Sequence, residues 1–148
     1  MLSWRSLTGG LIGIAILVLL MGIYSVAPNG PRTSAELVGH YVLDCEPTKQ
    51  ELNLESDGTF DQSILIKSTG EVFTTSGKWT YTTSGDWGRR EGEVKLDGAI
   101  RVLEWPDRLF RDYAKQLPGI ALLYANERFG RITIGADADS WPNYVKTE

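Results

Sequence analysis

An apolar stretch near the amino terminus constrains this chain more than any other feature. Residues 6–31 contain no charged side chain, and residues 7–27 are mostly aliphatic or small. About 20 apolar residues form a helix long enough to cross the hydrocarbon core of a bilayer. Trp4 and Tyr24 lie near the two ends of the stretch, where aromatic rings favour the membrane interface. We therefore expect a single-pass transmembrane helix over residues 7–27, preceded by a flank of residues 1–6.

A cleaved signal peptide is the alternative interpretation of the same stretch. Arg5 precedes the apolar core, and residues 25–27 (Ser-Val-Ala) are small, as a signal peptidase site requires. Cleavage after Ala27 would leave Pro28 immediately beyond the cut, which disfavours cleavage. We expect an uncleaved signal-anchor, and we keep the cleaved form as the alternative.

Charge on the two sides of the stretch gives the expected orientation. Arg5 and the amino terminus precede it, and Arg32 follows it. The positive-inside tendency favours a cytoplasmic amino terminus, although the asymmetry is small. Two prolines in residues 28–31 end the helix and begin a linker, which we assign to residues 28–35. The rest of the chain is then expected outside the cytoplasm, in the periplasm or on the outer face of the membrane.

After the linker the dominant sequence period is two, which is typical of β-strands with one buried face. Tyr41, Leu43 and Cys45 share one face of the first expected strand, and apolar residues alternate again over residues 52–66. Asp57-Gly58 predicts a tight hairpin, and Gly77 predicts a bulge or a bend in a later strand. Further strands are expected within these ranges: 94–96, 99–103, 120–125, 129–134 and 144–146.

A short helix is expected to interrupt the strands. Leu109, Tyr113 and Leu117 follow helical spacing, with Asp107 as the cap and Pro118 beyond the end. Six to eight short strands with one inserted helix predict a mostly β domain over residues 36–148. Its expected architecture is an antiparallel meander that forms a barrel or a strongly curled sheet.

Three short motifs carry a resemblance to a known family. Residues 37–41 (Leu-Val-Gly-His-Tyr) are similar to the G-x-W entry of lipocalin-like domains, with Tyr41 in place of Trp. Residues 52–60 (L-x-L-x-x-DGTF) and 77–81 (GKWTY) look like segments of small bacterial lipocalin-like domains. The resemblance covers residues 36–96 and implies a calycin-type β-barrel. Many such domains have no assigned activity, and the expected inserted helix puts full closure of the barrel in doubt.

Catalytic, metal and nucleic-acid signatures are missing from the sequence. His40 and Cys45 are the only histidine and the only cysteine, which excludes a zinc pattern. They lie five residues apart, so in a strand they point to opposite faces. With 15 basic and 19 acidic residues the net charge is −4, which disfavours binding to nucleic acid. We expect no enzyme activity, no metal and no cofactor.

Five aromatic and basic residues form the candidate binding surface. Trp87 lies in a polar segment beside Arg89 and Arg90, and Trp105 and Trp141 each precede a proline. A tryptophan flanked by arginine suits a protein contact or a lipid headgroup near the anchor. The alternative is that these rings cover the ends of the barrel.

The sequence therefore predicts a membrane-tethered extracytoplasmic binding module. The lipid bilayer is its first expected partner, through residues 7–27. The second is a small apolar ligand in the barrel mouth or an envelope protein at the tryptophans. One alternative is an envelope interaction or inhibitor protein with no small ligand. Another is a hydrolase in which two carboxylates converge, which the sequence alone does not reveal.

Overall fold

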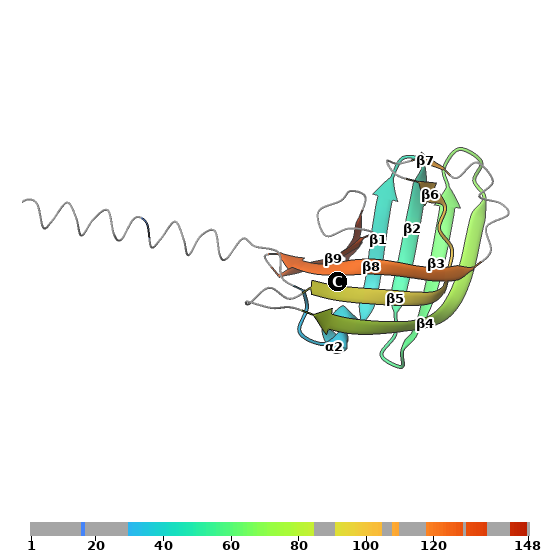
Figure 1. Ribbon diagram of the computed structural model, residues 1–148. Coiled ribbons are helices and arrows are strands. Elements are labelled where there is room, and N and C mark those ends of the chain that lie inside the picture. Colours follow the sequence, from blue (N-terminus) through green and yellow to red (C-terminus); the bar gives the residue numbers. More distant parts are fainter. Residues whose placement is uncertain are drawn as a thin grey trace, which may run out of the picture.

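The computed structural model (Figure 1) describes these parts of the chain: residue 16, and residues 30–84, 91–104, 108–109, 118–128, 130–135 and 143–147. The expected transmembrane stretch lies outside the described residues, apart from Ile16. Within the described parts, no helix has both the length and the apolar character needed to cross a bilayer.

Eight antiparallel strands close into a barrel. They are β1 (Gly39–Cys45), β2 (Thr48–Leu54), β3 (Thr59–Ile66), β4 (Val72–Ser84), β5 (Glu91–Ala99), β8 (Gly119–Arg128), β9 (Arg131–Gly135) and β10 (Asn143–Lys146). Each strand pairs with the next barrel strand along the chain, and β1 pairs with β10 to complete the circle. The barrel confirms the mostly β meander and is compatible with a lipocalin-like fold. It also shows that the segment inserted between β5 and β8 does not prevent closure.

The inserted segment differs from the expected helix. It forms a two-stranded ribbon of β6 (Leu103–Glu104) and β7 (Arg108–Leu109), and β7 occupies the start of the helix expected over residues 107–117. Pairing with β6 overrides the local helical spacing at Arg108 and Leu109. The rest of that expected helix lies outside the described residues. The helix that the structure does describe in the domain is α2 (Ser34–Leu37), which precedes β1.

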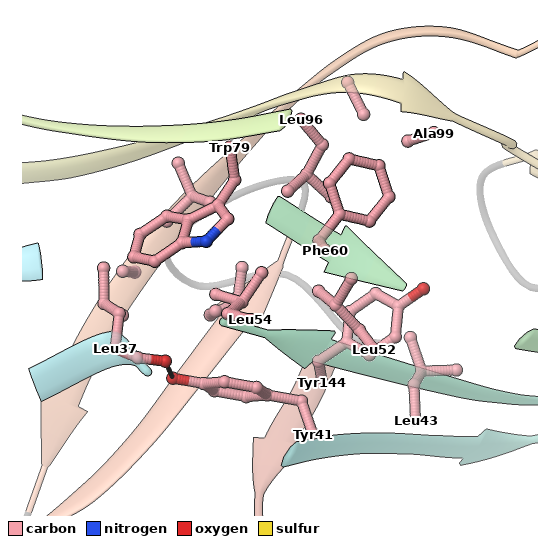
Figure 2. Close-up of a cluster of buried hydrophobic side chains, with 14 of the residues drawn as sticks. Leu37, Tyr41, Leu43, Leu52, Leu54, Phe60, Trp79, Leu96, Ala99 and Tyr144 are labelled. Atoms are coloured by element: carbon pink, nitrogen blue, oxygen red, sulfur yellow. Dashed lines mark hydrogen bonds between the residues drawn. The ribbon is translucent and has the colours of Figure 1, made fainter. Parts of the chain in front are cut away.

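The core confirms the period-two pattern. Inward-facing residues of β1 to β3 alternate with exposed or half-exposed ones, and Figure 2 shows Tyr41, Phe60 and Trp79 pointing into one cluster. Large aromatic and aliphatic side chains of this cluster pack from Leu37 of α2 to Cys45 at the end of β1. Its buried members are Leu37, Tyr41, Leu43, Cys45, Leu52, Leu54, Phe60, Trp79, Val94, Leu96, Ala99, Ala121, Ala125, Ile134 and Tyr144.

The hairpin expected at Asp57-Gly58 joins β2 to β3. Gly58 has a φ of +84°, which a glycine adopts without strain, and Asp57 Oδ1 accepts hydrogen bonds from the backbone and hydroxyl of Thr59. The Trp79 indole donates to the carbonyl of Glu55 at 2.9 Å. The DGTF and GKW segments thus form one packed unit in the folded protein.

Gly77 serves close packing rather than a bulge. The register of β4 with β3 is continuous through Gly77, and the shift lies opposite, on β5, between Asp97 and Ala99. A Cβ at Gly77 would lie 2.0 Å from the carbonyl oxygen of Asp97 and 2.9 Å from the Phe60 ring. Of the two alternatives expected at Gly77, the bulge therefore lies on the neighbouring strand.

Alternating strand direction gives the barrel two distinct ends. The linker end carries α2, the β2–β3 turn at residues 55–58, the β8–β9 turn and Thr147. The far end carries the β1–β2 turn at residues 46–47, the β3–β4 turn and the ribbon of β6 and β7 (Figure 1).

Candidate functional site

The five residues of the sequence-predicted surface lie outside the described residues. Trp87, Arg89 and Arg90 fall between β4 and β5, whose joined ends lie at the linker end. Trp105 falls between β6 and β7, and Trp141 between β9 and β10, which meet at the far end. This surface therefore stays a prediction.

The described barrel carries a different candidate site, a polar hollow on its outer wall. The hollow has a volume of about 450 Å³ and lies across β1, β2, β3 and β4. Its lining residues are polar or charged: His40, Glu51, Asn53, Asp61, Gln62, Ser63, Thr74, Thr75 and Ser76. We call this site the wall hollow.

Strand register explains why these side chains gather. His40 lies opposite Asn53, Asn53 opposite Asp61, and Asp61 opposite Ser76, so one row of outward residues crosses four strands. Directly opposed residues in antiparallel strands have Cβ atoms about 4.5–5.5 Å apart. The row therefore places an imidazole, an amide, a carboxylate and a hydroxyl side by side.

A second row runs parallel to the first. Glu51 lies opposite Ser63, and Ser63 lies opposite Thr74. Glu51 Oε1 is 2.8 Å from Lys49 Nζ, and Glu51 Oε2 is 3.8 Å from His40 Nε2. The hydrogen bond and positive charge of Lys49 hold the pKa of the Glu51 carboxyl below its usual value, so the carboxylate is ionised at neutral pH.

The histidine of the wall hollow is positioned from two sides. His40 Nδ1 is hydrogen-bonded to the hydroxyl of Thr147 at 2.8 Å, and its other nitrogen faces Glu51. Ser63 lies in the other row, opposite Glu51 rather than His40. The described contacts of His40 therefore orient it toward a carboxylate and do not make it the base of a serine nucleophile.

An ion-paired cluster lies on the same wall, at the far end of the barrel. Lys67 Nζ is 2.8 Å from Asp44 Oδ1 and 3.3 Å from Glu46 Oε1. The hydrogen bond and charge of Lys67 lower the pKa of the Asp44 carboxyl, and Asp44 in turn raises the pKa of Lys67. These pairs tie the β1–β2 turn to the end of β3.

A buried polar network crosses the inside of the barrel behind the wall hollow. The hydroxyl of Tyr144 donates to Gln50 Oε1 at 2.6 Å and accepts from Gln62 Nε2 at 3.2 Å. Gln50 Nε2 donates to the hydroxyl of Thr48 at 3.2 Å. Burial raises the pKa of Tyr144 to about 12, so the phenol stays neutral. Its hydroxyl can then donate a hydrogen bond to Gln50 and accept one from Gln62.

The lining of the wall hollow is rich in groups that can accept hydrogen bonds. Two carboxylates, two amides, an imidazole and four hydroxyl-bearing residues of β3 and β4 line it, and its lining includes no aliphatic residue and no Phe, Tyr or Trp. Such a surface suits a polar partner that brings hydrogen-bond donors or positive charge. In the part of the chain that the structure describes, no group of three or more His, Cys, Asp or Glu side chains is arranged to hold a metal ion.

Comparison with known proteins adds no relative: no family model, curated protein or solved structure matches the chain.

The wall hollow was not predicted from the sequence, although the hairpin that aligns two of its strands was. The Asp57-Gly58 hairpin sets the pairing of Asn53 with Asp61 and of Glu51 with Ser63. The contribution of β4 depends on tertiary pairing across the β3–β4 turn. No local pattern showed that the outer face is hollowed there.

Proposed function

We propose that this chain is a membrane-tethered extracytoplasmic binding module. Residues 7–27 anchor it in the bilayer with the amino terminus in the cytoplasm, and the barrel presents the wall hollow as its recognition surface. The observation that carries the proposal is the polar hollow itself, which gathers two carboxylates, a histidine and several hydroxyls from four strands into about 450 Å³.

The packing of the barrel supports one of the partners expected from the sequence over the other. Tyr41, Phe60, Leu52 and Leu54 are fully buried inside the described barrel, where a small apolar ligand would have to lie. Their packing counts against such a ligand and favours recognition on the outside. We propose that the partner is an envelope protein whose basic and hydrogen-bonding side chains enter the wall hollow.

A second surface favours a related candidate function, an interaction protein with no small ligand. Ile120, Leu122 and Tyr124 form a stripe on the outer face of β8, with exposed fractions of 59%, 51% and 38%. Exposed apolar stripes of this kind are typical of protein contacts. In this version the stripe, rather than the wall hollow, is the main contact.

The carboxylate hydrolase receives less support. A glycosidase-type acid needs a carboxyl group with a raised pKa. In the described residues, the carboxyl groups of Asp44, Glu51 and Asp57 are all shifted downward. Glu51 is therefore suited to hold a positive group rather than to donate a proton.

Native mass spectrometry of the full-length protein, extracted gently from its own membrane, tests the proposal. Ser63→Arg fills the wall hollow, Leu122→Arg charges the β8 stripe, and Thr82→Arg is the matched control on an exposed face of β4. We expect an added mass on the wild type and on Thr82→Arg that is lost in Ser63→Arg. Loss only in Leu122→Arg would favour the second candidate, and a bare mass in every form would contradict both.

A further inference from the structure

The linker is built into the barrel rather than hanging free from it. Gly30 and Pro31 are buried, and the hydroxyl of Tyr81 on β4 donates to the carbonyl of Pro31 at 2.6 Å. Lys146 Nζ on β10 donates to the carbonyl of Glu36 at 2.6 Å. The chain is thus held from its first described linker residue.

The next residues continue the attachment. Leu37 is fully buried in the core, and the hydroxyl of Tyr41 on β1 donates to the carbonyl of Leu37 at 2.7 Å (Figure 2). Three strands, β4, β10 and β1, therefore hold residues 30–37. Because these contacts are short and partly or fully buried, this segment moves with the barrel.

Very little chain separates the barrel from the expected membrane helix. Only Pro28 and Asn29 lie between Ala27, the end of the apolar stretch, and Gly30. Three residue steps span at most about 10 Å, and proline restricts the backbone further. The headgroup layer is itself about 5–7 Å thick on each side of the hydrocarbon core. The linker end of the barrel must then lie at the headgroups.

We infer that the linker end is a lipid-contact surface, and that the barrel stands on the bilayer in a fixed orientation. This inference rests on the proposed membrane anchor and adds the partner of one particular end of the barrel. The exposed parts of that end include the β2–β3 turn at Ser56 and Asp57 and the β8–β9 turn at Gly130 and Arg131. These residues carry both signs of charge, so the contact is imposed by the short tether rather than by attraction to anionic lipid.

The same geometry sets how the other surfaces of the barrel are oriented relative to the membrane. The wall hollow lies on the side of the barrel, with His40 and Asn53 near the linker end of their strands. The far end, with the turn at residues 67–70, points away from the membrane. An orientation of this kind restricts a protein partner of the wall hollow to one lying alongside the membrane.

Two matched serines test the orientation. Ser56 and Ser68 are both exposed turn residues, and they lie at opposite ends of β3. Eight residues of strand separate the two turns by about 26 Å. Ser56→Cys and Ser68→Cys are introduced singly into the full-length protein, labelled with a fluorophore and reconstituted into liposomes of a zwitterionic phospholipid. The buried Cys45 of the unsubstituted protein gives the background labelling.

A short-range quencher carried on the lipid headgroups is the readout. We expect quenching several-fold stronger at Ser56→Cys than at Ser68→Cys, and near-equal quenching after eight Gly and Ser residues are inserted between Asn29 and Gly30. Equal quenching with the native linker would overturn the inference, and so would a preference that survives the insertion. Release of the protein from the same liposomes by alkaline extraction would refute the anchor itself, whereas retention with equal quenching would refute only the orientation.

Discussion

The side-chain amide of Gln62 forms two hydrogen bonds with the backbone of Ile100. Its Nε2 donates to the Ile100 carbonyl at 3.1 Å, and its Oε1 accepts from the Ile100 N–H at 2.9 Å. The side-chain amide therefore satisfies the backbone N–H and carbonyl of Ile100, as the backbone of a neighbouring strand would. Ile100 is the first residue after β5. Ile100 and Val102 are buried beside Ile64 and Ile66, so this pairing holds the chain that covers the far end of the barrel.

Replacing Gln62 is expected to destabilise the packing of Ile100 and Val102 at the far end of the barrel. Gln62→Ala leaves the buried N–H and carbonyl of Ile100 without partners and removes one partner of Tyr144. We expect the free energy of unfolding to fall by about 2–4 kcal/mol. Chemical denaturation measures the loss. Ser63→Ala, the neighbouring outward-facing substitution, is the control and should change stability by less than about 0.5 kcal/mol. Equal stability of the two variants would show that the pairing with Ile100 contributes little.

Much of the fold could be predicted from the sequence because its signals are local. The alternation at Tyr41, Leu43 and Cys45 correctly gave the buried face of β1, and Asp57-Gly58 correctly gave the β2–β3 turn. The ribbon at Arg108 and Leu109 was missed because its partner strand, not its own spacing, decides its conformation.

The interior polar residues and the candidate site were harder to predict. Gln62 occupies an inward position between two apolar residues of β3, and its partner Ile100 lies 38 residues away. The wall hollow depends on the register of four strands at once. No property of Glu51 or Asp61 alone distinguishes either from an ordinary exposed carboxylate.

Gly77 provides a test of close packing between β4, β5 and the core. Gly77→Ala would place a methyl group 2.0 Å from a backbone oxygen of Asp97, which cannot move aside without disturbing β5. We expect a loss of about 2–3 kcal/mol in the free energy of unfolding. Gly119→Ala is the matched control, because nothing lies within 4 Å of its added Cβ. A Gly77→Ala protein as stable as Gly119→Ala would show that the strands are farther apart than described.

Tyr144 makes stability sensitive to alkaline pH. Its pKa is raised from 10.0 to about 12 in the folded protein, so its contribution is fully present below pH 10 and is lost as the pH rises from about 10 to about 12. We expect the wild type to lose about 2–3 kcal/mol more over this range than Tyr144→Phe, which is less stable at neutral pH but lacks the titrating phenol.

Urea denaturation at a series of pH values measures this difference. Tyr124→Phe, at an exposed position of β8, is the control and should follow the wild type. Parallel pH profiles for wild type and Tyr144→Phe would contradict the buried, neutral state of Tyr144.

Lys67 controls the ionisation of Asp44. Lys67→Met removes the hydrogen bond and the positive charge that lower the pKa of the Asp44 carboxyl, so that pKa should rise toward its ordinary value. Carboxyl carbon chemical shifts followed by NMR through an acid titration report it directly. In Lys78→Met, which removes an exposed lysine of β4, Asp44 should titrate as in the wild type. An unchanged Asp44 titration in Lys67→Met would exclude the ion pair in solution.

We propose that residues 7–27 hold the barrel on the extracytoplasmic side of a membrane. Thiol labelling of Ser68→Cys with a membrane-impermeant maleimide, in intact spheroplasts, tests it most directly. Unsubstituted protein, with its buried Cys45, gives the background. We expect strong labelling before lysis, with the labelled protein in the membrane pellet. Labelling that occurs only after lysis, or labelled protein in the soluble fraction, would contradict it.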